Sequence, residues 1–144
     1  MKQEEKPIPS SSILLSPYVE IFRKNGEKGY SLFGPPRKIS VITAPAPDLR
    51  GPAGQLSRES LHAMRKEQIL HMLFLMAYKG YRSITLGAWG CGVFLNPPED
   101  VAADFYEVLV LKNSRHLFDS ILFAIYCGDD KRNLYAFQRQ FGEE

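Results

Sequence analysis

The sequence predicts an α/β fold in three layers, in which helices cover both faces of a mostly parallel central sheet. Short runs rich in β-branched residues, at positions 39–43, 82–86 and 120–126, alternate with longer stretches of helical periodicity. Such alternation is typical of parallel strands joined by crossover helices. The chain has 144 residues, of which 44% are hydrophobic, so we expect one domain with one core.

The first third of the chain contains one predicted strand. Residues 1–12 are charged and then rich in Pro and Ser, which predicts a mobile tail. A proline at position 17 and a turn signal at positions 25–26 predict an irregular, extended lead-in over residues 13–36. The β-branched run at 39–43 lies between prolines and predicts a short buried strand.

The remaining elements follow in alternation. Ile69, Met72, Leu73 and Met76 recur at helical spacing, so we expect a helix from about Ser57 to Lys79 that ends at Gly80. After the strand at 82–86, Asn96 is the predicted N-cap of a second helix, with Pro97 at its first position and Glu99 closing a capping box. The predicted apolar faces of the last two helices are Val101, Ala102, Phe105, Val108 and Leu109, then Leu134, Phe137 and Phe141.

Charge and composition exclude several partners. The formal net charge is only +2, so we expect no direct contact with nucleic acid, and no apolar run reaches the roughly 20 residues of a membrane span. Acidic residues and a proline occupy the N-terminus where a signal peptide would be apolar, which predicts a cytoplasmic protein, or a nuclear one in a eukaryote. Cys91 and Cys127 are expected to be free thiols.

The loop after the second strand carries the clearest chemical pattern. Gly87, Gly90 and Gly92 precede a helix, so backbone N–H groups could approach an anion such as a diphosphate. A tight glycine turn with no ligand remains the alternative. A Walker loop is excluded because Cys91 follows the second glycine, and the glycine spacing differs from the Rossmann fingerprint.

Other reactive side chains predict no catalytic or metal site. Cys91 has no base placed beside it by sequence, and His62 and His71 are too far apart on one helix for a zinc pair, so both histidines are expected to pack or lie at the surface. Cys127 is a predicted core residue. Trp89 could stack on a ligand or pack under its own loop. Asp100 is expected to support the helix start, and Asp48 to contact a ribose hydroxyl.

The run Leu86-Gly87-Ala88-Trp89-Gly90-Cys91-Gly92-Val93-Phe94 with Asn96 beyond it, together with residues 41–47, resembles the microbial-type poly(ADP-ribose) glycohydrolases, which have a macrodomain fold. The resemblance covers residues 13–142. It implies an ADP-ribose site in which the glycine-rich run wraps the diphosphate and the distal ribose and Phe94 packs beside that ribose. It implies no metal and no cofactor. The implied ligand-binding residues are Thr43, Ala44, Pro45, Gly87, Ala88, Trp89, Gly90, Cys91, Gly92, Val93, Phe94 and Asn96.

The sequence departs from this family at the catalytic segment. The family carries a triple glycine followed by Gln-Glu-Glu, whereas this chain has no triple glycine, and its Gln3-Glu4-Glu5 lies close before Ile13. We therefore expect no catalytic residue, with Glu4 and Glu5 in a solvated tail. The domain, residues 13–144, is expected to lack the N-terminal side of the fold, and a partner or a second copy of the chain is expected to cover the exposed side of its sheet.

Together these observations predict a macrodomain-like binder of ADP-ribose, its polymer, or proteins that carry them, without complete catalytic machinery. An active glycohydrolase whose missing segment is supplied elsewhere is the first alternative. An interaction module without catalysis is the second. Whether the chain is an enzyme stays open at this point.

Overall fold

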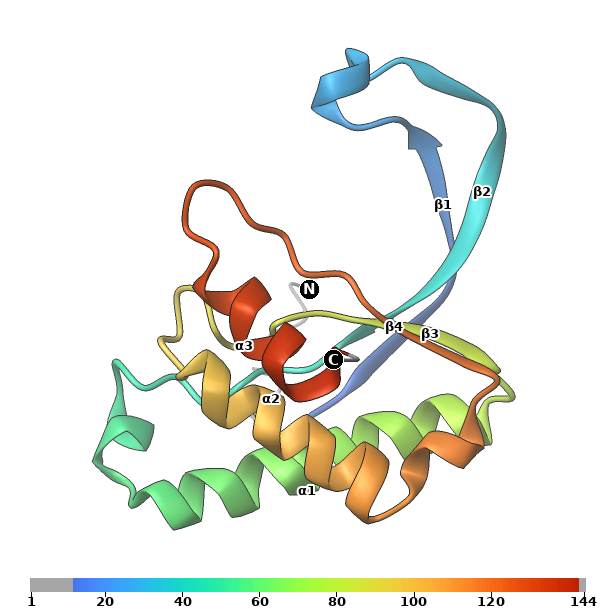
Figure 1. The fold of residues 1–144 in the computed structure, drawn as a ribbon. Helices are drawn as coiled ribbons and strands as arrows, with labels where there is room; N and C mark the ends of the chain where they lie inside the picture. Colours follow the sequence, from blue (N-terminus) through green and yellow to red (C-terminus); the bar gives the residue numbers. More distant parts are fainter. Residues whose placement is uncertain (1–11, 143–144) are drawn as a thin grey trace, which may run out of the picture. The chain divides into compact units, whose positions relative to one another are not determined.

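The computed structural model describes residues 12–142, and its contacts divide the chain into two compact units, Met1–Pro45 and Ala46–Glu144. Residues 1–11 of the predicted tail, with Glu4 and Glu5, lie outside the described part. Figure 1 shows both units as ribbons coloured along the chain. No helix in the described range is long and apolar enough to cross a membrane.

The first unit is an antiparallel hairpin. Strand β1 (Leu14–Arg23) pairs with β2 (Leu32–Thr43) from Leu14 opposite Thr43 to Arg23 opposite Leu32, and a short 3-10 turn, η1 (Gly26–Lys28), lies between them. The predicted irregular lead-in is therefore wrong, because β1 absorbs its proline through a register shift between Ser16 and Val19.

The predicted strand at 39–43 is the end of a longer strand and is not buried. Strand β2 begins seven residues earlier and contains Pro35 and Pro36, which were expected to lie outside it. Proline is tolerated in a strand where no partner needs its missing N–H, as at an edge or bulge. Most of β2 is exposed, including Ile39 at 44%, so β-branched composition alone was a poor guide to burial here.

The second unit alternates helices and strands in the predicted order. Its elements are η2 (Pro52–Gln55), α1 (Arg58–Tyr78), β3 (Ser83–Leu86), α2 (Pro98–Tyr106), the π-helical turn η3 (Glu107–Leu111), η4 (Ser114–Leu117), β4 (Ser120–Phe123) and α3 (Arg132–Phe141). Strands β3 and β4 are parallel, with Ser83 opposite Ser120 and Leu86 opposite Phe123. Helix α2 contacts both α1 and α3 (Figure 1).

The boundaries of α1 follow from local chemistry, as predicted. The Ser57 hydroxyl accepts the Ser60 backbone N–H at 3.1 Å, which caps the first turn. Gly80 has a φ of +82°, and its N–H donates to the Ala77 carbonyl, which ends the helix. The expected helix over 57–79 is thus confirmed.

The core of the second unit lies between α1, α2 and α3. Ile69 and Leu73 of α1 meet the predicted apolar face of α2 and η3, all of which is buried. Phe123 at the end of β4 packs against Phe105 of α2 and Phe137 of α3, with ring centroids 5.3 and 5.1 Å apart. These rings hold α2 against β4, the strand that pairs with β3. They therefore also fix both ends of the segment that connects β3 to α2. Cys127, predicted as core, lies past β4 and is only half-buried.

Candidate functional site

The glycine loop, residues 87–96, leaves the carboxyl end of β3 and leads to α2. Its backbone is folded by short-range bonds: the Cys91 N–H donates to the Ala88 carbonyl at 3.1 Å and the Leu95 N–H to the Gly92 carbonyl at 3.0 Å. Gly90 has a φ of +77°, and a Cβ there would lie 2.6 Å from the Ala46 Cβ. Gly90 is therefore required by the fold. An added Cβ at Gly87 or Gly92 would meet no close neighbour.

The side chain of Asn96 is buried and links two loops by hydrogen bonds. Its Nδ2 donates to the carbonyls of Pro47, at 2.8 Å, and Gly90, at 3.1 Å. The predicted N-cap role is wrong: Pro97 holds the N-cap position of α2, and no side chain caps that helix. The Asn96 side chain is turned inward to these two carbonyls and is therefore not available to cap the helix.

Several backbone N–H groups of the glycine loop have no acceptor among the described residues. Within the described residues, the amides of Gly90, Gly92, Val93 and Phe94 make no hydrogen bond to the protein. Val93 is 66% exposed and Gly92 is exposed, so this backbone can be reached from solvent. A cluster of unpaired N–H groups before a helix N-terminus is the arrangement that binds phosphate oxygens.

The edge of the loop carries an aromatic ring and a positive charge. The Leu49 N–H donates to the Phe94 carbonyl at 3.1 Å, and the Arg50 guanidinium lies 5.5 Å from the centre of the Phe94 ring. Arg50 also pairs with Asp48 through two side-chain bonds, and their hydrogen bond lowers the pKa of Asp48. The Asp48 carboxylate is thus occupied by Arg50 in this structure, whereas the sequence suggested a ribose contact.

Cys91 has the character of a buried thiol. Burial is the main reason why its pKa is raised to about 12. A thiol with that pKa is protonated at neutral pH, so it is a poor nucleophile, as expected from the sequence. Among the described residues, no group of three or more histidine, cysteine or acidic side chains could hold a metal ion.

Beneath the loop lies a polar cluster that sequence reasoning missed. We call Arg58, His62, Arg65, Asp100 and Asp104 the Arg65 cluster. Arg65 of α1 is fully buried, and its Nε donates to Asp104 of α2 at 2.6 Å. His62 Nδ1 lies 2.5 Å from the same carboxylate.

Asp100 lies in the first turn of α2, where it was expected to support the helix start, and it also joins α2 to α1. It accepts two hydrogen bonds from Arg58, and these bonds are the main cause of its lowered pKa. Positions 58, 62 and 65 share one helix face, and 100 and 104 share another. That spacing is the signal in the sequence that could have revealed the cluster.

The remaining predicted residues are placed as follows. Thr43 ends β2 and is exposed, and Ala44 and Pro45 follow it in the first unit. In the second unit, Trp89 is half-buried within the glycine loop, with its backbone N–H donating to the Gly87 carbonyl at 2.8 Å. Ala88 is half-buried beside it. His71 is exposed, in agreement with the expected surface or packing role.

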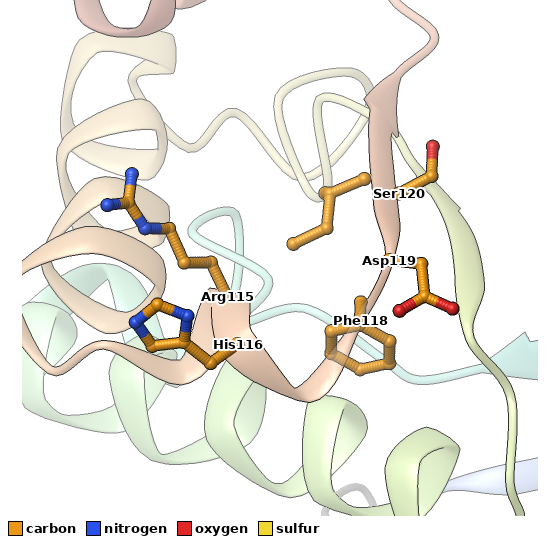
Figure 2. A pocket seen from close by; sticks show the side chains of 6 residues that line it. Arg115, His116, Phe118, Asp119 and Ser120 are labelled. Carbon is orange, nitrogen blue, oxygen red and sulfur yellow. The ribbon is translucent and has the colours of Figure 1, made fainter.

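A hollow elsewhere on the second unit is open and shallow. It is lined by Arg115, His116, Phe118, Asp119, Ser120 and Ile121 (Figure 2). Ser120 begins β4 and pairs with the first residue of β3, so this hollow lies at the amino ends of the strands. The glycine loop leaves the opposite, carboxyl end, where parallel sheets bind ligands. The hollow therefore does not belong to the candidate site.

Comparison with solved structures identifies similar enzymes. Poly(ADP-ribose) glycohydrolase from Deinococcus radiodurans, in complex with ADP-ribose, is 32% identical, with a TM-score of 0.79 over 89% of this chain and 51% of that chain. The enzyme from Thermomonospora curvata is 29% identical, with a TM-score of 0.82 over 90% of this chain and 47% of that chain. No family model and no curated protein matches the chain.

These similarities confirm the α/β, macrodomain-like fold class and show that the chain is similar to microbial poly(ADP-ribose) glycohydrolases. The chain spans about half the length of each of these enzymes. The described part accordingly contains one parallel strand pair and one antiparallel hairpin, a partial version of the longer fold.

Proposed function

We propose that this chain is related to the poly(ADP-ribose) glycohydrolases and binds ADP-ribose, free or as part of its polymer on modified proteins. The observation that carries the proposal is the set of unpaired N–H groups at Gly90, Gly92, Val93 and Phe94. These are donors without acceptors in a loop that could not be formed with a side chain at Gly90. The ADP-ribose in the similar Deinococcus radiodurans structure supports the choice of ligand.

The chemistry of the loop matches a diphosphate. A diphosphate carries two negative charges and several acceptor oxygens, which backbone N–H groups can bind without a metal ion. The N-terminus of α2 adds a partial positive charge, and the Arg50 guanidinium lies at the edge of the loop beside Phe94. Phe94 would provide the apolar wall next to the distal ribose. The roles of Thr43, Ala44, Pro45 and Trp89 are proposed from the resemblance alone.

Isothermal titration calorimetry with ADP-ribose tests this proposal directly. We expect saturable binding by the wild-type protein and none by Gly90→Val, whose side chain would displace Ala46 and Asn96. Adenosine, which has the base and a ribose but no diphosphate, should bind much more weakly. If a folded wild-type sample gives no heat with millimolar ADP-ribose, the proposal is wrong. An interaction module that does not bind this ligand then becomes the better interpretation.

A second candidate function is hydrolysis of the polymer, because the similar structures are glycohydrolases. Cleavage of a glycosidic bond needs a positioned carboxyl group as general acid or base. No residue of the glycine loop provides one, and Glu4 and Glu5 lie outside the described residues. Release of ADP-ribose from purified polymer by this protein alone would favour the enzyme, and Glu4→Ala with Glu5→Ala would show whether those residues contribute.

A further inference from the structure

The glycine loop rests on a single charged side chain that is wholly buried. Arg65 is the largest side chain in the described part with no exposed surface. It reaches two acceptors outside α1: Nε lies 2.6 Å from an Asp104 carboxylate oxygen, and Nη1 lies 3.4 Å from Asn96 Oδ1. Arg65 thus connects helix α1 to Asn96, the residue that links the two loops.

The contact with Arg65 fixes the orientation of the Asn96 amide. A guanidinium can only donate hydrogen bonds, so the Asn96 oxygen must face Arg65. The Asn96 NH₂ group must then face the other way, where it donates to the Pro47 and Gly90 carbonyls. The Gly90 carbonyl also accepts the Asn96 backbone N–H at 3.1 Å. With its carbonyl held twice, the peptide plane after Gly90 cannot rotate freely, and the following N–H groups keep their direction.

Stability alone is a weak reason for this arrangement. A buried ion pair loses in desolvation much of what it gains in attraction, and apolar side chains of similar size often serve the fold equally well. Lysine could replace the charge opposite Asp104 but not the planar fork that donates to Asp104 and Asn96 together. What this position needs is the planar arrangement of the guanidinium N–H donors and not a positive charge alone.

We propose that Arg65 is a positioning residue for the glycine loop, acting through Asn96 to hold the unpaired N–H groups in the arrangement that receives a diphosphate. This inference rests on the proposed function. It assigns Arg65 no contact with the ligand, since the side chain is wholly buried. The remaining members of the Arg65 cluster hold the guanidinium in place from α1 and α2.

The test compares Arg65→Lys with a matched control, Lys66→Met. Lys66 is the next residue on α1 and pairs with Glu107 on η3, so it makes no bond to the loop. We expect Arg65→Lys to weaken ADP-ribose binding by about tenfold or more, the effect of losing one buried hydrogen-bond partner. Lys66→Met should bind like the wild type. If Arg65→Lys also binds like the wild type, the proposal is wrong and the proposed function stands.

Hydrogen exchange in the absence of ligand gives a second readout. The N–H groups of Leu49, Leu95 and Asn96 are bonded to loop carbonyls, so their protection reports how firmly the loop is held. In Arg65→Lys we expect these three to exchange about tenfold faster relative to amides of α3. An equal loss of protection in α3 would show a purely structural role and overturn the proposal. This measurement decides the matter even if the wild type binds no ADP-ribose.

Asn96→Asp provides a variant that remains informative if Arg65→Lys fails to fold. An aspartate can still accept from Arg65, whose charge it faces, but its side chain cannot donate to Pro47 and Gly90, so the side-chain link to the loop is cut. We expect faster exchange at Leu49 and Leu95 and weaker binding. Adding Arg65→Lys to Asn96→Asp should weaken binding little further, because both act through the same bond. Unchanged loop protection in Asn96→Asp, or additive effects of the two changes, would refute the proposal.

Discussion

Asn96 donates its side-chain Nδ2 to the carbonyl of Gly90, six residues earlier in the same loop, at 3.1 Å. The bond closes the glycine loop on itself, and the companion bond to Pro47 ties it to the preceding segment. The Asn96 side chain takes up the Gly90 carbonyl, while the neighbouring N–H groups of Gly90, Gly92 and Val93 make no bond within the described residues. The loop is therefore held in shape before any ligand arrives, which lowers the entropic cost of binding.

The first prediction concerns Gly90. Gly90→Ala places a Cβ 2.6 Å from Ala46 and 2.8 Å from Asn96 Nδ2 at a positive φ, so we expect a loss of about 2 kcal/mol or more in the free energy of unfolding. Gly92→Ala is the control, because its Cβ would meet nothing within 4 Å. Thermal unfolding should show a fall in Tm of roughly 5–10 °C for the first and little change for the second. Equal stability of both variants would contradict the loop geometry.

The second prediction separates charge pairing from loop positioning. Arg65→Met leaves the buried Asp104 carboxylate without its cation, which should cost roughly 3–5 kcal/mol. Adding Asp104→Leu removes the stranded charge, and we expect the double variant to recover most of that loss in a denaturant titration. ADP-ribose binding should not recover, because Asn96 still lacks its donor. Recovery of both would show that Arg65 serves only to neutralise Asp104.

Sequence reasoning succeeded where structure is set locally. The helix from about Ser57 to Lys79, its stop at Gly80 and the apolar face from Val101 to Leu109 depend on residues a few positions apart, and all three were confirmed. The glycine loop was found for the same reason, since the glycines are close neighbours. Its unpaired N–H groups could not be predicted, because they depend on how the distant Pro47 carbonyl and Leu49 N–H bond to the loop.

Sequence reasoning failed where tertiary partners decide. Asn96 before two prolines has the local pattern of an N-cap, but the carbonyls of Pro47 and Gly90 take the same side chain. Asp100 lies in the first turn of α2 as expected, but its bond to Arg58, 42 residues away in sequence, was not predicted. Strand β1 was missed because Pro17 reads as a break, whereas pairing with β2 accommodates it in a register shift.

The third prediction concerns the exposed apolar surface of the second unit. Leu122 of β4 is 58% exposed, and Tyr126 beyond it is 92% exposed. Within the described residues β4 pairs only with β3, and a two-stranded parallel sheet is normally extended or covered. We expect self-association in size-exclusion chromatography or binding of an apolar fluorescent dye, both reduced in Leu122→Glu. A stable monomer that binds no dye would argue against a covering partner.

The fourth prediction is a dependence on acidic pH. Arg58 lowers the pKa of Asp100 below its ordinary 3.8, so the folded state holds this proton less tightly than the unfolded chain does. The pair therefore stabilises the fold above about pH 4, and that contribution is lost as the pH falls through the lowered pKa. The Tm difference between wild type and Arg58→Gln should shrink from neutral pH to about pH 2.5.

Arg132→Gln is the control for that experiment. Arg132 pairs with Asp130 in a similar way, but both side chains are largely exposed, so the pair should contribute little stability at any pH. If the two variants lose the same stability at neutral pH, the burial of Asp100 gives its ion pair no advantage.

The fifth prediction is a dependence on alkaline pH at Cys91. Burial raises the pKa of this thiol from its ordinary 9.0 to about 12, so the folded protein keeps a proton that the unfolded chain releases between those values. The folded state is then penalised as pH rises above about 9, whereas below that pH the thiol is protonated in both states and has no effect. Cys91→Ala removes the thiol that titrates, while the tyrosines and lysines titrate in both proteins.

The Tm of the variant relative to wild type should therefore rise between about pH 8 and pH 10.5. A constant difference would mean that Cys91 can ionise in the folded loop, and rapid alkylation of Cys91 at about pH 8 would point the same way.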